Sequence, residues 1–422
     1  WIQFHNDSPY NSGGGLNTME RATDFLDAMD SFAGQMVTTI GSNKLNELRV
    51  QYAHRHQSSV LNDDSGVGPA VTITGVAGFG SPLSGTGQGN AGFDFKQNIT
   101  QVIDNFSYIR GAHSFKVGFD FQHVYDERTA AAQWAYTFPS VATYLAAKNG
   151  TNPFGYQFMD QITGDLGFNM GTNIQSYFIQ DDWQVRPSLK VLYGLRYDLY
   201  QYPDGLANAP LAQTQSFNID RNNWGPRIGL ALKLDDKTVL RAGGAIYYAS
   251  TTAGGFSTST LAISDLAETA FIASLDNNLT PTPGTNLSNP FPNGIVQAPT
   301  AFPGALYGYG QQLLPVKVRD IVQPMIGQWN LSLQRELPGH LKAQVAYAGS
   351  AGIALLSGPT DINQLTPEAL ALDATVLNTQ VANPFLALPV EQRPAASSIL
   401  GRATVTVARA SRMARSAGRP AR

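Results

Sequence analysis

Two histidines separated by one residue, His54 and His56, are the first candidates for chemistry in this sequence. Residues two apart on a β-strand point to the same face, so both imidazoles could reach one metal ion. A zinc site takes at least three ligands from the protein, and the neighbouring sequence supplies no third. We therefore expect no metal site here and interpret the two residues as a pair in a lumen or at a rim.

Adjacent carboxylates at Asp181 and Asp182 could suggest acid–base catalysis. Neighbouring strand residues point to opposite faces, so these side chains are poorly placed to act together, and we interpret them as structural. The glycines at 75–80 and 85–89 lack the strand-to-helix context of a phosphate loop, and the Asp-Asp-Ser-Gly segment at 63–66 lacks the spacing of a calcium loop. No G-x-S-x-G, H-E-x-x-H or P-loop motif occurs. The sequence predicts a protein that is not an enzyme and has no cofactor.

Aromatic residues in expected loops are the candidates for ligand contact, namely Trp134, Tyr136, Tyr307 and Tyr309. The alternative, which we favour, is that they belong to an interfacial girdle or pack within the loops. The sequence does not identify the ligand.

The composition separates this chain from ordinary soluble domains. Only 14% of its 422 residues are charged, whereas about 25% is usual. The net charge of −3 argues against a nucleic-acid partner, and the absence of cysteine excludes disulfides and thiolate chemistry. No run approaches the roughly 18 apolar residues of a membrane helix. With 41 glycines, 17 tyrosines and 21 phenylalanines, the chain is expected to be β-rich, with an outside that needs few charges.

Alternation of apolar and polar residues is the main structural signal. Between Ser114 and Gln122 four apolar side chains share one face, opposite lysine, glycine, aspartate and glutamine. Five further segments repeat the pattern, at 47–52, 190–199, 227–234, 329–334 and 341–347. In all six, every charged residue lies opposite the apolar row. A Lys or Arg facing lipid costs about 2–4 kcal/mol at the midplane, so the apolar row fits lipid and the mixed row fits a wet lumen.

We predict ten strands, at 33–41, 44–56, 97–110, 113–126, 173–186, 188–201, 224–234, 238–249, 324–336 and 340–350. Most reach ten residues, the length of a tilted membrane strand, whereas soluble strands usually have about five or six. Short turns alternate with long loops near 57–96, 127–172, 202–223 and 250–323. Outer-membrane barrels combine short periplasmic turns with long extracellular loops in this way. One loop contains a predicted helix, Val141 to Lys148, with Ser140 as its N-cap.

The predicted fold class is all-β: an antiparallel transmembrane β-barrel, partial, with about ten strands of a larger barrel and long extracellular loops. We divide the chain into an N-terminal loop segment at 1–32, the partial barrel at 33–350, a loop region at 351–400 and a tail at 401–422. The tail holds six arginines and no acid, and we expect it to be non-native. Because the chain opens at Trp1 rather than Met, we expect a processed chain or a fragment.

Several motifs resemble those of TonB-dependent receptors. The segment Ser176-Tyr177-Phe178-Ile179-Gln180-Asp181-Asp182-Trp183, followed by Leu-Tyr-Gly-Leu-Arg-Tyr-Asp at 192–198, is similar to the YxQDDW…LxLGLRYD pattern of that family. Stretches at 222–229, 238–243 and 328–339 resemble its Oar-like branch, and 113–118 resembles its recurrent hairpin start. The matches extend over residues 33–350.

The resemblance implies a roughly 22-stranded barrel with a plugged lumen, which takes up a scarce or bulky ligand with energy from TonB. It implies the outer membrane of a Gram-negative-type bacterium, with outer-membrane lipid, the TonB complex and an unknown transported ligand as partners. The sequence contains no recognisable plug domain, TonB box or regulatory-like domain. We therefore expect a segment of the wall of a longer transporter, coupled to TonB through a plug domain absent here.

Two other interpretations stay open at this point. A β-rich cell-surface adhesin or carbohydrate-binding module would have short strands, charge on its wet face and folding without detergent. A small ten-stranded porin would require residues 1 and 422 to be true ends. Strand length and the asymmetry of the loops favour the receptor segment.

Overall fold

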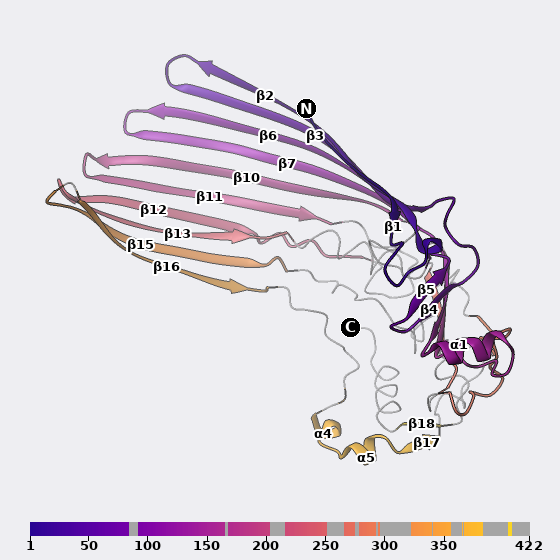
Figure 1. Cartoon of the computed structure of the whole chain (residues 1–422). Helices are drawn as coiled ribbons and strands as arrows, with labels where there is room; N and C mark the ends of the chain where they lie inside the picture. Colours follow the sequence, from indigo (N-terminus) through magenta and orange to yellow (C-terminus); the bar gives the residue numbers. More distant parts are fainter. Residues whose placement is uncertain are drawn as a thin grey trace.

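The computed structural model describes residues 1–83, 92–164, 168–202, 216–250, 266–274, 278–292, 294–295, 322–339, 341–355, 365, 367–382 and 404–406. Within these residues the strands form one antiparallel sheet of eleven strands, one sheet of five and one of two. The large sheet is a curved surface with its hairpin turns along one end, and the five-stranded sheet lies toward the other end (Figure 1). No helix in the described part of the chain is long and apolar enough to cross a bilayer.

The large sheet runs up and down in chain order. Its strands are β1 (Ile2–Asn11), β2 (Thr23–Ile40), β3 (Lys44–Leu61), β6 (Phe93–Arg110), β7 (His113–Ala130), β10 (Phe168–Arg186), β11 (Leu189–Gln201), β12 (Trp224–Asp235), β13 (Thr238–Tyr248), β15 (Met325–Leu337) and β16 (Leu341–Ile353). All ten predicted strands are present, and the all-β, antiparallel, partial-barrel prediction is confirmed. Glycines with positive φ stand in two of the predicted short turns, Gly111 at +57° and Gly339 at +80°, a backbone region that glycine enters without steric cost.

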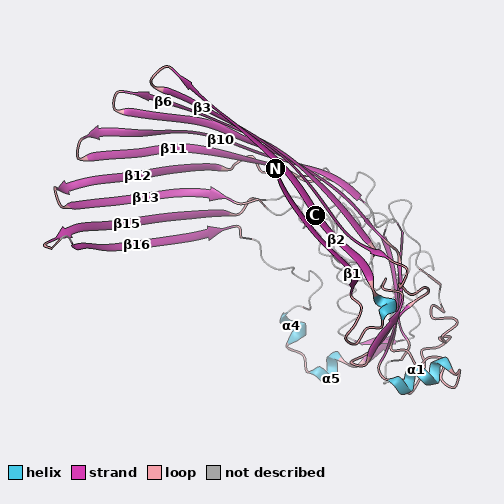
Figure 2. Cartoon of the chain, turned by 45° about the horizontal axis from the view of Figure 1, so that its top comes forward, coloured by secondary structure: helices cyan, strands magenta, loops and turns pink. Residues whose placement is uncertain are grey.

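The five strands that follow β1 in the large sheet are longer than a bilayer requires. β2, β3, β6 and β7 each have 18 residues and β10 has 19. At roughly 3.3 Å per residue such a strand reaches about 60 Å, against about 30 Å of hydrocarbon. Even when tilted, such a strand is longer than the hydrocarbon is thick, and Figure 2 shows these strands as long ribbons.

The interpretation of residues 1–32 as a loop segment was wrong. Residues 2–11 form β1, and β2 begins at Thr23, ten residues before the predicted strand. Asp24, Asp27 and Asp30 interrupt the apolar alternation of this stretch, so the pattern did not indicate a strand. Backbone pairing decides the matter instead, because Ile2 to Asn11 pairs with Ser31 to Thr23 in an antiparallel ladder.

Strand register places the predicted apolar rows on one face of the sheet. Tyr197 pairs with Tyr177 and with Trp224, and Tyr177 also pairs with Phe119. These side chains are well exposed, together with other members of the rows: Val117, Ile179, Tyr193, Leu195, Ile228, Trp329, Leu331, Leu333, Val345 and Tyr347. We call this surface the outer face. Its apolar side chains form an outer belt and do not enter a dry interior.

The dry core of the chain lies in the loops. The five-stranded sheet has the order β14 (Leu266–Ile272), β9 (Phe158–Gly164), β8 (Gln133–Phe138), β4 (Ala70–Ile73) and β5 (Ala77–Gly80). With helix α1 (Val141–Lys148) it forms a unit that we call the loop assembly. The predicted helix is confirmed, and Ser140 caps it by accepting a hydrogen bond from the Thr143 backbone N–H. A cluster of buried apolar residues fills the assembly, including Phe138, Tyr156 and Met159.

The large sheet is open. β16 pairs only with β15, and β1 covers only the Thr23–Ser31 half of β2. Among the described residues, no second strand partner lies beside Phe32–Ile40 of β2 or along the outer edge of β16. Hydrocarbon does not tolerate unpaired backbone groups. A closed wall therefore requires further strands at both edges.

Short elements follow the large sheet within the predicted loop region at 351–400. They are α4 (Pro367–Leu370), α5 (Ala374–Leu377) and β17 (Gln380–Ala382). β17 pairs with β18 (Thr404–Thr406), which lies in the segment interpreted as a non-native tail. The other residues of that tail lie outside the described part of the chain.

Gly118 on β7 generates a prediction about packing. A Cβ there would lie 2.5 Å from Asn105 Oδ1, 2.7 Å from the Asp104 carbonyl and 2.7 Å from the Phe178 ring. Gly118→Ala should destabilise the sheet by about 1–3 kcal/mol through overpacking. Gly34→Ala is the matched control, because no atom lies within 4 Å of its Cβ position. The denaturant midpoint of the full-length protein in lipid measures both, and equal midpoints for the two variants would contradict the packing.

Neighbouring residues on β10 test the assignment of the two faces. Ile179 lies on the outer face and is 60% exposed, whereas Gln180 points to the opposite face. Ile179→Arg should cost about 2–4 kcal/mol, because its cation faces lipid, and Gln180→Arg should cost about 1 kcal/mol or less. Heat-modifiable migration after refolding into lipid vesicles reports folding of each variant. A reversed order would mean that the faces are assigned the wrong way round.

Candidate functional site

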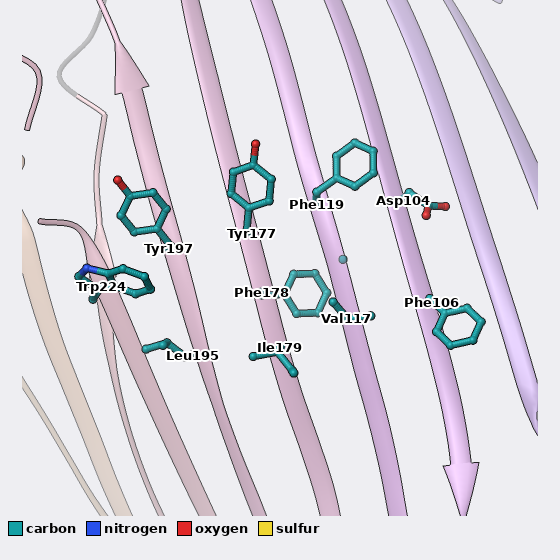
Figure 3. A pocket seen from close by; sticks show the side chains of 11 residues that line it. Asp104, Phe106, Val117, Phe119, Tyr177, Phe178, Ile179, Leu195, Tyr197 and Trp224 are labelled. Atoms are coloured by element: carbon teal, nitrogen blue, oxygen red, sulfur yellow. The ribbon is translucent and has the colours of Figure 1, made fainter. Parts of the chain in front are cut away.

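An apolar groove crosses the outer face over β6, β7, β10, β11 and β12 (Figure 3). It encloses about 510 Å³. Aliphatic and aromatic side chains line it, among them Phe106, Val117, Phe119, Ile179, Leu195 and Trp224. The hydroxyls of Tyr177 and Tyr197 point along the direction in which β11 runs, from the hairpin turns to the loops (Figure 3). The groove is thus apolar along its length, with the two tyrosine hydroxyls at its loop-side end.

One carboxylate, Asp104, borders this groove. Its Oδ1 accepts a hydrogen bond of 2.7 Å from Asn46 Nδ2 on the neighbouring strand β3. Register places both residues on the outer face, because Asp104 pairs with Leu48 and with Phe119. The sequence analysis missed this pair, since the segment 97–110 shows no clean alternation. Only pairing with the flanking strands identifies the face of Asp104.

A second outer-face acid, Asp181, is enclosed by aromatic rings near the hairpin turns. Its Oδ2 accepts from His113 Nδ1 at 2.7 Å and from the Tyr193 hydroxyl at 2.9 Å. The His113 ring stacks between Phe115 and Trp183, with centroids 5.4 Å from each. Asp182 points the other way, toward Lys190 at 3.4 Å. The two adjacent aspartates thus point to opposite faces of the sheet, as predicted.

The opposite, inner face carries a network of polar side chains. Arg196 Nε and the Ser176 hydroxyl both donate to Asp198. The same face holds further pairs between neighbouring strands: Gln101 with Asp120, Gln97 with Asp126, Arg55 with Asp27, and Arg241 with Gln334. Each pair satisfies donors and acceptors without a dry core, so the inner face suits a water-filled lumen or a polar partner.

The two histidines lie on the outer face beyond the belt, toward the loops. His54 Nδ1 contacts Asn98 at 2.8 Å, and His56 Nε2 contacts Asp94 at 2.7 Å. They share a face as predicted and form a rim pair. In the described ranges, no group of three or more His, Asp or Glu residues is arranged to hold a metal ion.

Two of the four predicted ligand contacts lie in the described residues. Trp134, on β8, is 42% exposed and available at the surface. Tyr136 is only 6% exposed, and its ring contacts Tyr156 edge-on at 5.4 Å. Its hydroxyl donates to the Leu287 carbonyl at 3.1 Å, so Tyr136 packs within the loop assembly, in agreement with the alternative interpretation. Tyr307 and Tyr309 lie outside the described part of the chain.

The glycine-rich and Asp-Asp-Ser-Gly segments are structural where they are described. The Gly80 N–H donates to Glu20 Oε2 at 2.9 Å, in the strand that follows the β4–β5 turn. Ser65 Oγ donates to the Ala22 carbonyl at 2.7 Å. Buried Arg21 joins this region by donating to the Ser81 carbonyl and to Thr72 Oγ1. The glycines at 85–89 lie outside the described residues.

A model of the outer membrane beta barrel domain family matches residues 1–406. The chain therefore belongs to the outer membrane β-barrel domain family. It is a protein of the bacterial outer membrane, and its apolar outer face contacts lipid.

Solved transporters and receptors of the outer membrane have similar folds. The chain is similar to the outer membrane transporter YddB from Escherichia coli, with 11% identity, a TM-score of 0.46, and coverage of 79% of this chain and 35% of that one. It is similar to the siderophore receptor PirA from Acinetobacter baumannii, with 13% identity, a TM-score of 0.39, and coverage of 78% and 35%. It is also similar to the copper transporter OprC, with 11% identity, a TM-score of 0.39, and coverage of 78% of this chain and 39% of that one. The chain thus spans little more than a third of these proteins, and no curated protein matches it.

Burial of Tyr136 generates a prediction about alkaline pH. Burial raises the pKa of Tyr136 to about 12, above the value of about 10 in an unfolded chain. Below pH 10 both states keep the proton, so the stability that this group contributes is fully present. It is lost as the pH rises from about 10 to 12, by roughly 3 kcal/mol in all.

Tyr136→Phe should remove this part of the alkaline loss, at a pH-independent cost of about 1 kcal/mol for the lost hydrogen bond. Near-ultraviolet circular dichroism of the full-length protein between pH 9 and 12 measures the loss of packing in the loop assembly. Tyr10→Phe, which removes an exposed phenol, is the control. An unchanged alkaline midpoint in Tyr136→Phe would show that Tyr136 does not govern the transition.

Proposed function

We propose that this chain forms part of the wall and the outer loops of a TonB-dependent receptor of the Oar-like type. Such a receptor takes up a scarce or bulky ligand across the outer membrane. The proposal assigns the plug, the coupling to TonB and the remaining strands to other parts of the parent protein. The chain itself supplies eleven described strands, the inner polar face and the loop assembly.

The observation that carries the proposal is the asymmetry of the sheet. Its outer face is apolar and its inner face is a polar network. Its two ends also differ, with short turns at one and long loops at the other, as in outer-membrane barrels. Short hairpin turns occupy one end, and a folded loop assembly occupies the other (Figure 1). A polar inner wall below a structured outer opening is the arrangement needed to pass a polar ligand inward.

The receptor motifs form a coherent local structure. The segment 176–183 and the segment 192–198 are the two arms of one hairpin, β10 and β11. Within it, Asp181 binds Tyr193 across the strands on the outer face, and Ser176 binds Asp198 on the inner face. The motif residues thus hold the hairpin together through both faces, which supports a role in the wall and not in catalysis.

An adhesin or carbohydrate-binding module is the alternative from another class. Such a module would bury its apolar rows between packed layers and fold in water. Here the rows that contain Ile228, Trp329 and Val345 are exposed on the outer face. The folded loop assembly would suit surface recognition in either case, so the discriminating property is energy-dependent uptake.

Uptake by cells that produce the full-length protein tests the proposal. Loss of TonB, or a protonophore, should abolish ligand accumulation while leaving surface binding intact. Depletion of compounds from a defined mixture, followed by mass spectrometry, identifies the ligand whatever its chemical class. Binding without accumulation in TonB-competent cells would favour the adhesin, and accumulation that persists without TonB would indicate a passive pore.

Within this chain, we propose Trp134 as a residue that contacts the ligand. Trp134→Ala should weaken binding by about tenfold or more, as for aromatic anchors at interfaces. Val141→Ala on α1 is the matched control, since both side chains are 42% exposed on the loop assembly. Equal affinities of the two variants would remove Trp134 from the site and leave the uptake proposal standing.

A further inference from the structure

Arg227, on β12, lies on the inner face among residues with little or no side chain. In the ladder it is opposite Gly194 of β11 and Ala245 of β13. Its neighbours on the same face of its own strand, two residues away in each direction, are Gly225 and Gly229. We call these residues the arginine basin. None of the four neighbours has a polar side chain, so none of them can neutralise the cation.

Two larger side chains flank the arginine basin. The Arg227 guanidinium carbon lies 5.8 Å from the centroid of the Tyr247 ring, a cation–π contact that helps to hold the guanidinium in place. Arg196 lies opposite Gly225 and is therefore a diagonal neighbour of Arg227 on the same face. Diagonal neighbours in an antiparallel pair are about 7–8 Å apart, so a second cation lies within reach of one small ligand.

Arg227 differs from the other cations on the inner face of β11, β12 and β13 because it has no polar partner. Asp198, the acid on this face of β11, already accepts from Arg196 and Ser176. Arg227 makes no hydrogen bond or ion pair within the described residues, and its Nε is a buried donor without an acceptor. The other cations each have a partner: Lys190 with Asp182, Arg196 with Asp198, Lys233 with Asp236, and Arg241 with Gln334.

An oxyanion is the group that would satisfy this site. Guanidinium groups bind carboxylate and phosphate oxygens through charge-assisted, often bidentate hydrogen bonds, and a buried donor that lacks an acceptor is destabilising. We propose that Arg227, with Arg196 beside it, binds a carboxylate or phosphate group of the transported ligand. The word transported rests on the proposed function, which makes the inner face the wall of the ligand's path. The substrate class is then an acidic solute.

Arginine labelling of the full-length protein in detergent tests the site. Phenylglyoxal modifies accessible guanidinium groups, and peptide mass spectrometry gives the rate at each arginine. Inorganic phosphate or citrate, at about four times its dissociation constant, should slow modification of Arg227 about fivefold. Chloride at the same ionic strength should not, because screening alone does not occupy the site. Arg241, on the same face but bonded to Gln334, is the internal control and should react at the same rate with and without the anions.

A matched pair of variants separates the site from general protection. Arg227→Gln should abolish the protection of Arg196 by phosphate, whereas Arg241→Gln should leave it unchanged. Heat-modifiable migration verifies that both variants are folded. Glycine variants do not suit this purpose, since a Cβ at Gly225 would lie 2.7 Å from the Ile246 carbonyl and disturb the sheet.

Three outcomes would overturn the proposal. One is equal modification of Arg227 with and without phosphate and citrate. Another is an Arg227 that resists phenylglyoxal before any anion is added, which would assign the site to a carboxylate of the parent protein itself. The third is uptake, in the depletion experiment, of the same acidic compounds by Arg227→Gln and by the wild type. The labelling needs neither TonB nor uptake, so its failure leaves the uptake proposal standing, and absent uptake leaves the anion site standing without a role in transport.

Discussion

Backbone hydrogen bonding in hydrocarbon is the constraint on which this structure depends. No water is available there to satisfy a free N–H or C=O group, so each strand must find a partner on both sides. The eleven strands meet this demand by pairing with their neighbours in chain order, through short turns at one end of the sheet and longer connections at the other. The two edges of the sheet do not meet it within the described residues, and that is why the sheet is a part of a wall and not a closed barrel.

The different side-chain chemistry of the two faces of the sheet also follows from the hydrocarbon solvent. With every backbone group occupied in the ladder, a side chain has only two environments, lipid outside and water or protein inside. Apolar rows on the outer face and linked polar pairs on the inner face satisfy both. Two of the exceptions have local partners. Asp104 is held by Asn46, and Asp181 is enclosed by His113 and Tyr193, so each of these two acids has a donor on a neighbouring strand.

The loop assembly obeys the opposite rule, because it lies in water. There the apolar side chains gather in a dry cluster around Tyr156, Phe138 and Met159, as in a small soluble domain. Helix α1 covers part of it and is fixed by a capping box at Ser140. The polypeptide is thus stabilised in two ways. An apolar belt contacts lipid, and an apolar core in the loop assembly is shielded from water. A rigid outer part of this kind can present Trp134 in a fixed position.

Alternation in six segments determined that they are strands and which face each apolar row occupies, because a period of two is a local property of an extended chain. The local sequence also determined α1, because its N-cap residue Ser140 and the helix lie in one short segment. Backbone pairing between strands decided the features that local sequence did not. β1 and the first half of β2 carry no clear alternation and exist because neighbouring strands complete their ladders. Asp104 acquired a face, Tyr136 became a core residue and the groove acquired its walls only when strands distant in sequence were brought side by side, which no local pattern encodes.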